Sequence, residues 1–295
     1  MIVVVGGSGA LGRLVVADLL ARGEQVRVVV RDTARATKVL GPDVEVVAAD
    51  VRQLGTLDAA VKGASTVVSA VHGFLGGRGA GPTDVDRDGN ANLVAAAKTT
   101  GADVVLMSVI GAAADSPLDL FRAKYAAEDH LRASGVPFTV VRSGPFLETW
   151  IGVMRKTAGK GGRPMVFGRG EQPNPFVSAV DVATVVALAA TTTTLRGKVL
   201  EVAGEPVTMV ELARAVQVAD GRTSKPRHLP RAMLRAMSIL AGPVNPAFAR
   251  QNKAALMMDT VDIGGDPSLR TRLGLPRART LADVLAETSV ESRLT

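Results

Sequence analysis

Short apolar runs alternate with helix-periodic segments along the first half of the chain. The apolar runs have the length and the β-branched composition of buried strands, and they cover Ile2–Val5, Val26–Val30, Val44–Ala48, Thr66–Ala70, Val104–Met107 and Phe138–Val141. Between them, apolar residues recur at helical spacing over 11–22, 56–62, 84–99 and 118–134. A glycine stands just past each of these segments, where a helix commonly ends in a left-handed residue. Strands that alternate with helices predict a parallel sheet with helices on both faces.

The pattern changes after Pro145, where the regular alternation ends. The glycine- and proline-rich segment 157–175 predicts a loop with one short hairpin, whereas Lys198–Val202 predicts a strand that returns to the sheet. From Pro230 onward the periodicity is mostly helical. We therefore expect an α/β fold in two parts. A Rossmann-type, doubly wound domain covers 1–149 and is completed by 176–203, and a smaller, mostly helical substrate-side region covers 150–295, mainly 150–175 and 204–295.

The first strand stops at a glycine-rich turn, and a helical segment follows at once. The turn has glycines at a spacing of three and comprises Gly6, Gly7, Ser8, Gly9, Ala10, Leu11 and Gly12. Glycine has no Cβ, so the backbone can turn tightly and approach a ligand closely. The first N–H groups of the following helix lack partners and lie at the positive end of its dipole, which suits a diphosphate. Because the motif lies between a strand and a helix, it predicts a dinucleotide site rather than a turn that binds nothing.

The residues that follow the second and third strands predict which dinucleotide is bound. A carboxylate after the second strand favours the free 2′-hydroxyl of NAD, and an arginine favours the 2′-phosphate of NADP. Arg31 is the first residue past this strand and Arg35 adds charge nearby, so NADP(H) is preferred. Asp32 leaves NAD(H) as the alternative if it binds the ribose hydroxyl, and it could instead cap the residues that follow. Asp50, with the adjoining Val51, is a candidate to bind adenine, and it could equally accept hydrogen bonds from its own loop.

The composition limits the class of protein. With 47% hydrophobic residues the chain can bury a sizeable core, and the absence of cysteine excludes disulfides, thiolate metal sites and a cysteine nucleophile. The formal net charge is +7, but the Lys and Arg residues are scattered and aromatic residues are few, so nucleic-acid binding is not expected. No apolar stretch approaches the roughly 20 residues that span a bilayer, and no His/Asp/Glu cluster has metal-ligand spacing. We expect a cytoplasmic protein without signal peptide, membrane partner or metal.

Several segments resemble the atypical branch of the short-chain dehydrogenase/reductase superfamily, the NmrA-like and isoflavone-reductase-like proteins. Besides the glycine turn, the resemblance rests on the segments Val30–Asp32, Asp88–Lys98, Leu106–Ala112, Ala123–Glu128 with the run that continues to Pro145, and Phe176–Ala183. It covers residues 1–204 and is thin beyond them. The resemblance implies a nicotinamide dinucleotide as cofactor and a reductase as the activity.

The resemblance also implies catalytic residues, and here the chain departs from the pattern. Most reductases of the superfamily use Ser, Tyr and Lys, with the tyrosine four residues before the lysine as proton donor. The lysine is present as Lys124, which is expected to bind the nicotinamide ribose or to act as the acid itself. Position 120 is Leu120, which cannot donate a proton. The single tyrosine, Tyr125, lies about 100° around the helix from Lys124.

Further candidates lie at the carboxyl ends of the strands, where ligands of open α/β sheets bind. Ser108 at the end of the fifth strand could hydrogen-bond a carbonyl or the nicotinamide. His72, past the fourth strand, is suited to proton transfer near neutral pH. The cofactor-binding candidates of this rim are Ser69, Ala70, Val71, Ser108, Lys124, Gly144 and Pro145.

Three functions remain open at this point. The first is an NADPH-dependent oxidoreductase that transfers hydride to a small carbonyl, quinone or conjugated substrate without the usual tyrosine. The second is an NADP(H)-binding, redox-sensing regulatory protein without turnover, which the missing tyrosine motivates. The third is an isomerase or epimerase that holds its nucleotide permanently. A homodimer and a regulatory protein partner are both compatible with the sequence.

Overall fold

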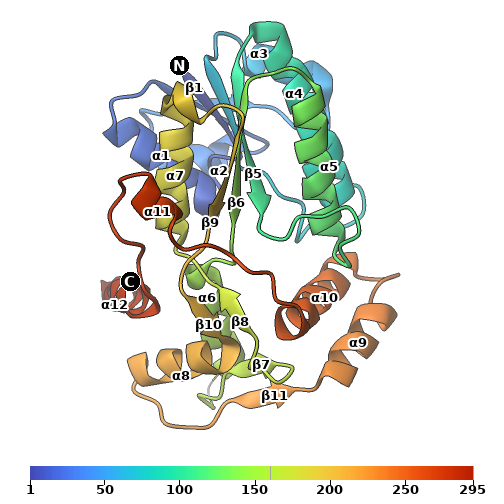
Figure 1. Cartoon of the computed structure of the whole chain (residues 1–295), viewed down its shortest axis with the longest axis vertical. Helices are drawn as coiled ribbons and strands as arrows, with labels where there is room; N and C mark the ends of the chain where they lie inside the picture. Colours follow the sequence, from blue (N-terminus) through green and yellow to red (C-terminus); the bar gives the residue numbers. More distant parts are fainter. Residues whose placement is uncertain (160, 295) are drawn as a thin grey trace. The chain divides into compact units, whose positions relative to one another are not determined.

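The chain divides into two compact units. The computed structural model describes residues 1–159 and 161–294 (Figure 1). The first unit consists of Met1–Arg142 and Val182–Leu200, and the second consists of Ser143–Asp181 and the chain from Glu201 onward. Each unit therefore joins segments that are far apart in sequence.

A seven-stranded sheet forms the centre of the first unit. Its order is β3-β2-β1-β4-β5-β6-β9, with β1 (Ile2–Val5), β2 (Val26–Val30), β3 (Glu45–Ala48), β4 (Thr66–Ser69), β5 (Asp103–Val109), β6 (Phe138–Ser143) and β9 (Lys198–Val202). β1 pairs in parallel with both β2 and β4, so that Ile2 stands opposite Val26 on one side and Thr66 on the other. The strand order reverses beside β1, and this is the switch point at which open α/β sheets bind ligands.

Helices cover both faces of this sheet. They are α1 (Ala10–Ala21), α2 (Thr33–Leu40), α3 (Leu57–Ala60), α4 (Asn90–Thr100), α5 (Asp119–Ala133) and α7 (Ala179–Thr191). In Figure 1, α1 and α7 lie on one face, and α4 and α5 lie on the other. Val3 and Val5 of β1 pack in one buried cluster with Leu93 of α4 and Leu131 of α5. A π-helix, η2 (Thr83–Gly89), leads directly into α4, and short 3-10 turns occupy Leu54–Thr56 and Thr193–Leu195.

The predicted Rossmann-type fold is confirmed, and β1, β2 and β9 have the predicted bounds. The predicted helix over 84–99 is divided between η2 and α4. The helical prediction missed α2, whose eight residues bury Ala36 alone. This helix is shorter than the window of about 11–18 residues over which helical periodicity is normally recognised.

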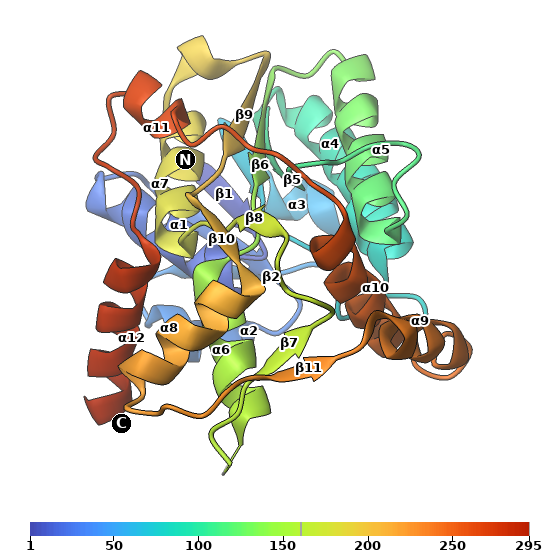
Figure 2. The same cartoon turned by 60° about the horizontal axis from the view of Figure 1, so that its bottom comes forward.

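The second unit has its own helices and two small sheets. The helices are α6 (Leu147–Ala158), α8 (Met209–Ala219), α9 (Arg231–Leu240), α10 (Pro246–Thr260), α11 (Leu269–Arg272) and α12 (Leu281–Leu294). Its core joins Ile151 and Met154 of α6 with Leu212 of α8 and Val284 of α12. Figure 2 shows α12 beside α8.

The predicted hairpin within 157–175 is wrong. β7 (Met165–Phe167) pairs in parallel with β11 (Arg227–Leu229), and β8 (Pro173–Pro175) pairs antiparallel with β10 (Pro206–Thr208). The connection between β7 and β8 is bound to α10. The buried carboxylate of Asp259 in that helix accepts hydrogen bonds from the N–H groups of Arg169 (3.0 Å) and Gly170 (2.6 Å). Lys160, in the same predicted loop, lies outside the described residues.

Candidate active site

The glycine turn between β1 and α1 is closely packed on its inner side. Gly6 has a φ of +83°, and its carbonyl accepts a hydrogen bond from the Gly9 N–H at 3.0 Å. A Cβ on Gly12 would lie 2.2 Å from the Gly6 oxygen, and a Cβ on Gly7 would lie 2.8 Å from Val28 Cγ1. The packing of α1 against the turn and β2 therefore requires glycine at both positions.

The outer side of the same turn is open. Gly9 is the N-cap of α1, and no side chain caps this helix. Gly9 and Ala10 are exposed and Ser8 is half-buried, whereas Leu11 is buried in the core. A Cβ on Gly9 would approach the Gly6 oxygen at 3.3 Å and would otherwise stand in open space. Free N–H groups beside small residues fit a diphosphate, so this turn is suited to a dinucleotide.

Two arginines follow β2 without a carboxylate partner. The side chains of Arg31 and Arg35 are exposed, and neither forms an ion pair with any residue that the structure describes. Asp32 is the N-cap of α2, and its carboxylate accepts a hydrogen bond from the Arg35 N–H at 2.9 Å. Asp32 thus acts as the helix cap, and the two guanidiniums are the groups left to bind a 2′-phosphate.

Asp50, past β3, is engaged by its own loop. It accepts hydrogen bonds from the Arg52 backbone N–H (3.0 Å) and from the Arg52 Nε (3.0 Å). These hydrogen bonds lower the pKa of Asp50 below its ordinary value, and the nearby charge of Arg31 lowers it further. Arg52 also donates to the Gly79 carbonyl at 2.7 Å, which fixes the loop at residues 73–81 to the segment after β3. Of the two roles open to Asp50, the loop role is the one formed here, and the adjoining Val51 is buried.

The end of β4 adjoins the glycine turn. Ser69 is fully buried, and its hydroxyl donates to Asn90 Oδ1 at 2.5 Å. Ala70 and Val71 are half-buried. The Ala70 carbonyl oxygen lies 3.0 Å from where a Cβ on Gly6 would stand, so the structure brings the two predicted segments together.

Lys124 of α5 is buried, with 4% of its side chain exposed. Its Nζ donates to the carbonyls of Val71 (3.0 Å) and Met107 (2.9 Å). Its charge is paired with Asp86, whose Oδ1 lies 2.9 Å from Nζ and whose Oδ2 accepts the Gly73 N–H at 2.7 Å. The Nζ–Oδ1 contact has the distance of an ion pair but not the angle of a hydrogen bond, so its attraction is mainly Coulombic. In this arrangement the Lys124 ammonium joins the segment after β4 to β5 and η2, and it is directed at protein acceptors.

Ser108 of β5 belongs to a second buried network, which is centred on Glu128 of α5. Its hydroxyl donates to Glu128 Oε1 at 2.5 Å. The fully buried Glu128 also accepts Arg142 Nε (2.9 Å) and Nη2 (2.8 Å) and Arg132 Nη2 (2.7 Å). Burial by itself raises the pKa of Glu128, but the hydrogen bonds from Arg142 and Ser108 outweigh it and place the pKa below its ordinary value. The single hydroxyl proton of Ser108 is therefore used inside the protein.

His72 is the predicted catalytic residue that remains open to solvent. Its side chain is exposed at the edge of the site. The protein atoms packed around it, and the charge of Lys124, lower the pKa of His72 below its ordinary value. The imidazole is therefore mostly neutral at pH 7 and poorly suited to act as an acid. The loop that follows is tightly folded, because a Cβ on Gly76 would lie 1.7 Å from the Ala80 oxygen.

The remaining predicted residues lie apart from these networks. Leu120 and Tyr125 are both half-buried on α5. Gly144 and Pro145 belong to the second unit. A Cβ on Gly144 would lie 2.0 Å from the Pro175 oxygen, so glycine is required there by packing within that unit.

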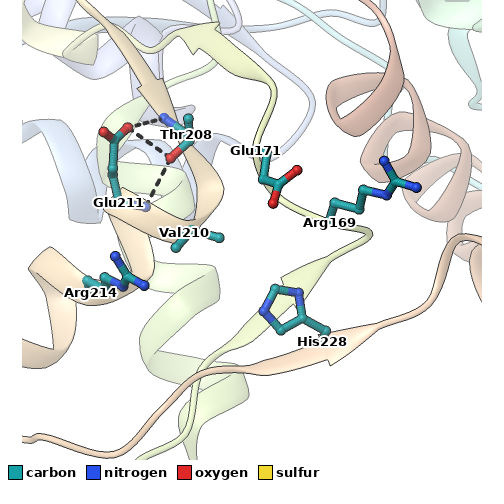
Figure 3. Close-up of a pocket in the computed structure, with 7 residues that line it drawn as sticks. All are labelled: Arg169, Glu171, Thr208, Val210, Glu211, Arg214 and His228. Carbon is teal, nitrogen blue, oxygen red and sulfur yellow. Dashed lines mark hydrogen bonds between the residues drawn. The ribbon is translucent and has the colours of Figure 1, made fainter.

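The second unit contains an open hollow that no sequence motif predicted (Figure 3). Its volume is about 480 Å³, and it is lined by Arg169, Glu171, Thr208, Val210, Glu211, Arg214 and His228. Thr208 and Glu211 are already paired as the capping box of α8. Figure 3 shows Arg169 and Arg214 on opposite sides of the hollow, with His228 between them.

Sequence reasoning missed the acids and the arginines that hold the candidate residues. Asp86, Glu128, Arg142 and Arg52 were not identified. A signal was available for two of them, since Asp86 and Glu128 stand on faces of predicted helices that otherwise carry apolar residues. A buried acid at such a position requires a cation or several hydrogen-bond donors.

The comparisons with known proteins identify the family. A model described as the NmrA-like family matches residues 1–262. The chain belongs to the NmrA-like family. This member is 32% identical over 224 residues to the NAD(P)H azoreductase of Xenophilus azovorans, covering 75% of this chain and 74% of that protein. It is 24% identical over 225 residues to quinone oxidoreductase 2 of Escherichia coli (strain K12), covering 75% of each.

Solved structures share the fold of this NmrA-like protein. The NADPH-dependent quinone oxidoreductase of Escherichia coli, complexed with NADPH, matches with a TM-score of 0.78 at 23% identity, covering 98% of this chain and 99% of that one. The Citrobacter sp. triphenylmethane reductase complexed with NADP(H) matches with a TM-score of 0.76 at 22% identity, covering 97% of this chain and 99% of that one.

Across the described residues, no helix combines the length and apolarity needed to cross a bilayer, and no group of three or more His, Asp or Glu side chains is placed to hold a metal ion.

Proposed function

We propose that this protein is an NADPH-dependent reductase that transfers hydride to a small quinone or similarly conjugated acceptor. The observation that carries the proposal is the open glycine turn at the start of α1, with the unpaired Arg31 and Arg35 beside it. The azoreductase and quinone oxidoreductase relatives support the same class of reaction.

The first unit supplies the cofactor site in this proposal. The N–H groups of the first turn of α1 bind the diphosphate, and a Cβ at Gly9 would enter that space. Arg31 and Arg35 bind the 2′-phosphate, because a guanidinium forms paired hydrogen bonds with phosphate oxygens. Asp50 and Arg52, which follow β3, form the adjoining side of this cofactor site. The second unit, with the predicted substrate-side region 150–295, selects the acceptor.

The buried polar residues constrain the chemistry. Bound NADPH supplies a hydride, that is, two electrons and one hydrogen nucleus. Leu120 has no proton to give, Lys124 and Ser108 are directed at protein acceptors, and His72 is mostly neutral. Addition of hydride to a simple aldehyde or ketone produces a strongly basic alkoxide that needs an acid at once. Addition to a quinone produces a delocalised hydroquinone anion, which can take its proton from water, so the site favours quinones over simple carbonyls.

Calorimetric titration and turnover test the proposal together. We expect NADPH to bind more tightly than NADH, and Arg31→Ala or Arg35→Ala to weaken NADPH by about tenfold each, since a charged hydrogen bond contributes about 1.5–3 kcal/mol. NADH affinity should stay unchanged, as should both affinities in the exposed control Lys62→Ala. Turnover with a quinone should exceed turnover with an aldehyde. Absence of nucleotide binding would overturn the cofactor site, and equal binding of the two cofactors would overturn the role of the arginines.

The regulatory alternative has an observation of its own. The same engagement of Lys124 and Ser108 is what a nucleotide-binding protein without turnover would show. NADPH binding without oxidation across a panel of quinones, azo compounds and aldehydes would favour that alternative. A cytoplasmic location, a homodimer and a regulatory partner stay predictions.

A further inference from the structure

The positive charge of the chain is concentrated in one segment of the second unit. Residues 221–258 contain seven Lys and Arg residues and no Asp or Glu. The 28 basic residues outside this segment balance the 28 acidic residues of the whole chain. The formal net charge of +7 therefore equals the charge of this segment.

The helix α9 in this segment has an apolar outer face. Leu234 and Ser238 are buried, while Ile239 is 72% exposed and Leu240 is 77% exposed. Met233 lies on the same exposed side and is 50% exposed. A surface helix of a globular protein normally places polar residues on its outer face, whereas the outer face of α9 carries these three large apolar side chains.

Further exposed apolar side chains lie in the connection to α10 and at the start of α10. Figures 1 and 2 show α9 and α10 side by side, and we call residues 231–260 the α9–α10 hairpin. Val244 in its connecting turn is 88% exposed, and Phe248 in the first turn of α10 is also exposed. The exposed apolar side chains thus come from both helices and from the turn between them. Isolated apolar residues are ordinary on a surface, but a group of this kind marks an interaction site.

Exposed cations accompany this apolar surface. Arg235 of α9 and Lys253 of α10 are exposed, and neither forms an ion pair within the described chain. Arg231, in contrast, is paired with Asp259 at 2.5 Å. Apolar side chains accompanied by unpaired cations are the combination that adsorbs to the interface of an anionic membrane.

We propose that the α9–α10 hairpin binds peripherally to an anionic lipid surface. Its apolar side chains enter the boundary between headgroups and acyl chains, and Arg235 and Lys253 contact lipid phosphates. A symmetric dimer through the same face would bring two cationic segments together, which like charges oppose. Single-stranded nucleic acid would call for aromatic stacking platforms, and Phe248 is the sole aromatic residue of the hairpin. The proposal is independent of the reductase activity.

Vesicle sedimentation with the full chain tests the proposal. The probes are vesicles of phosphatidylcholine alone and vesicles of phosphatidylcholine mixed with phosphatidylglycerol. We expect binding to the mixed vesicles that weakens as salt is added, and little binding to the neutral ones. Ile239→Glu combined with Leu240→Glu should lower the binding constant at least tenfold, and Arg235→Glu combined with Lys253→Glu should abolish the preference for phosphatidylglycerol.

A matched control separates the hairpin from general surface effects. Val218 on α8 is 77% exposed, like Leu240, so Val218→Glu should leave vesicle binding unchanged. All variants should keep the thermal unfolding temperature of the parent, because the substituted side chains are exposed. No binding to the mixed vesicles at low salt, equal binding to both vesicle types, or an equal loss in Val218→Glu would each overturn the proposal. A dimer in solution that is dissociated by the substitutions at Ile239 and Leu240 would also overturn the proposal.

Discussion

Lys124 and Glu128 lie one turn apart on α5, and both charged groups are buried with partners of their own. Lys124 is paired with Asp86, and Glu128 with Arg142 and Arg132. Removing one member of such a pair leaves the other charge buried without compensation. At the scale of the residue, both side chains therefore contribute to stability, whatever part they take in catalysis.

Lys124→Met tests whether this lysine stabilises the folded protein or binds the cofactor. We expect the free energy of unfolding in urea to fall by about 3–5 kcal/mol, because the substitution leaves the Asp86 carboxylate buried and unpaired. The NADPH Kd of the folded protein should change by less than about threefold, since the Nζ is directed at protein acceptors. The exposed control Lys62→Met should change stability by less than about 0.5 kcal/mol. A large rise in the NADPH Kd with an unchanged free energy of unfolding would instead support binding of the nicotinamide ribose by Lys124.

Glu128 predicts a pH dependence of stability. Its pKa lies below the ordinary value of 4.5, so the folded state favours the ionised carboxylate more than the unfolded state does. The resulting stabilisation is present above pH 4.5 and is lost as the pH falls through the lowered pKa. We expect unfolding free energies measured from neutral to acid pH to fall more steeply for the parent than for Glu128→Gln. Parallel curves for the two proteins would contradict this role.

At the scale of the element, the glycines between β1 and α1 serve two different purposes. Gly7 and Gly12 allow α1 to pack against the turn and β2, whereas Gly9 leaves the outer side free. The same substitution should therefore affect folding at one position and ligand binding at the other.

Gly9→Ala and Gly12→Ala separate these purposes. At Gly9 we expect NADPH affinity to fall by about tenfold or more, with a loss of stability below about 1 kcal/mol, because the new methyl group enters open space at the helix N-cap. At Gly12 the methyl group would collide with the Gly6 oxygen, so the free energy of unfolding should fall by about 1–3 kcal/mol. Gly152→Ala in α6 is the control, and it should raise stability by up to about 1 kcal/mol. Titration and thermal unfolding measure both effects, and unchanged NADPH affinity in Gly9→Ala would argue against a diphosphate at this turn.

At the scale of the whole molecule, a few buried carboxylates connect segments that are distant in sequence. Asp181 lies in the first turn of α7, which begins at Ala179. Its carboxylate accepts the Arg279 N–H at 2.6 Å and the Arg279 Nη1 at 2.9 Å, and Arg270 Nη2 lies 3.4 Å away. This fully buried acid thus holds the segment that follows α11 within the second unit.

Asp181→Ala should release that segment. Arg270 is itself buried, so its guanidinium would lose its carboxylate, and we expect a loss of about 3–5 kcal/mol in unfolding free energy. Amide hydrogen exchange should accelerate between residues 269 and 281 before it does so in β1 or β4. Arg277→Ala is the control, because Arg277 is exposed and pairs with Asp283 alone among the described acids. Uniform acceleration over both units would show that Asp181 supports the whole fold instead.

The sequence by itself determined the strands of the central sheet and most of the helices between them, the glycine turn and the arginines after β2. These features are encoded by neighbouring residues, because a strand buried on both faces is a continuous apolar run and a helix repeats its apolar residues every three to four positions. The partners of the polar groups were decided by tertiary structure alone. Lys124 reaches Val71 across 53 positions, and Asp181 reaches Arg279 across 98. Such pairs depend on which elements packing brings together, and a local pattern shows at most that a buried charge needs a partner.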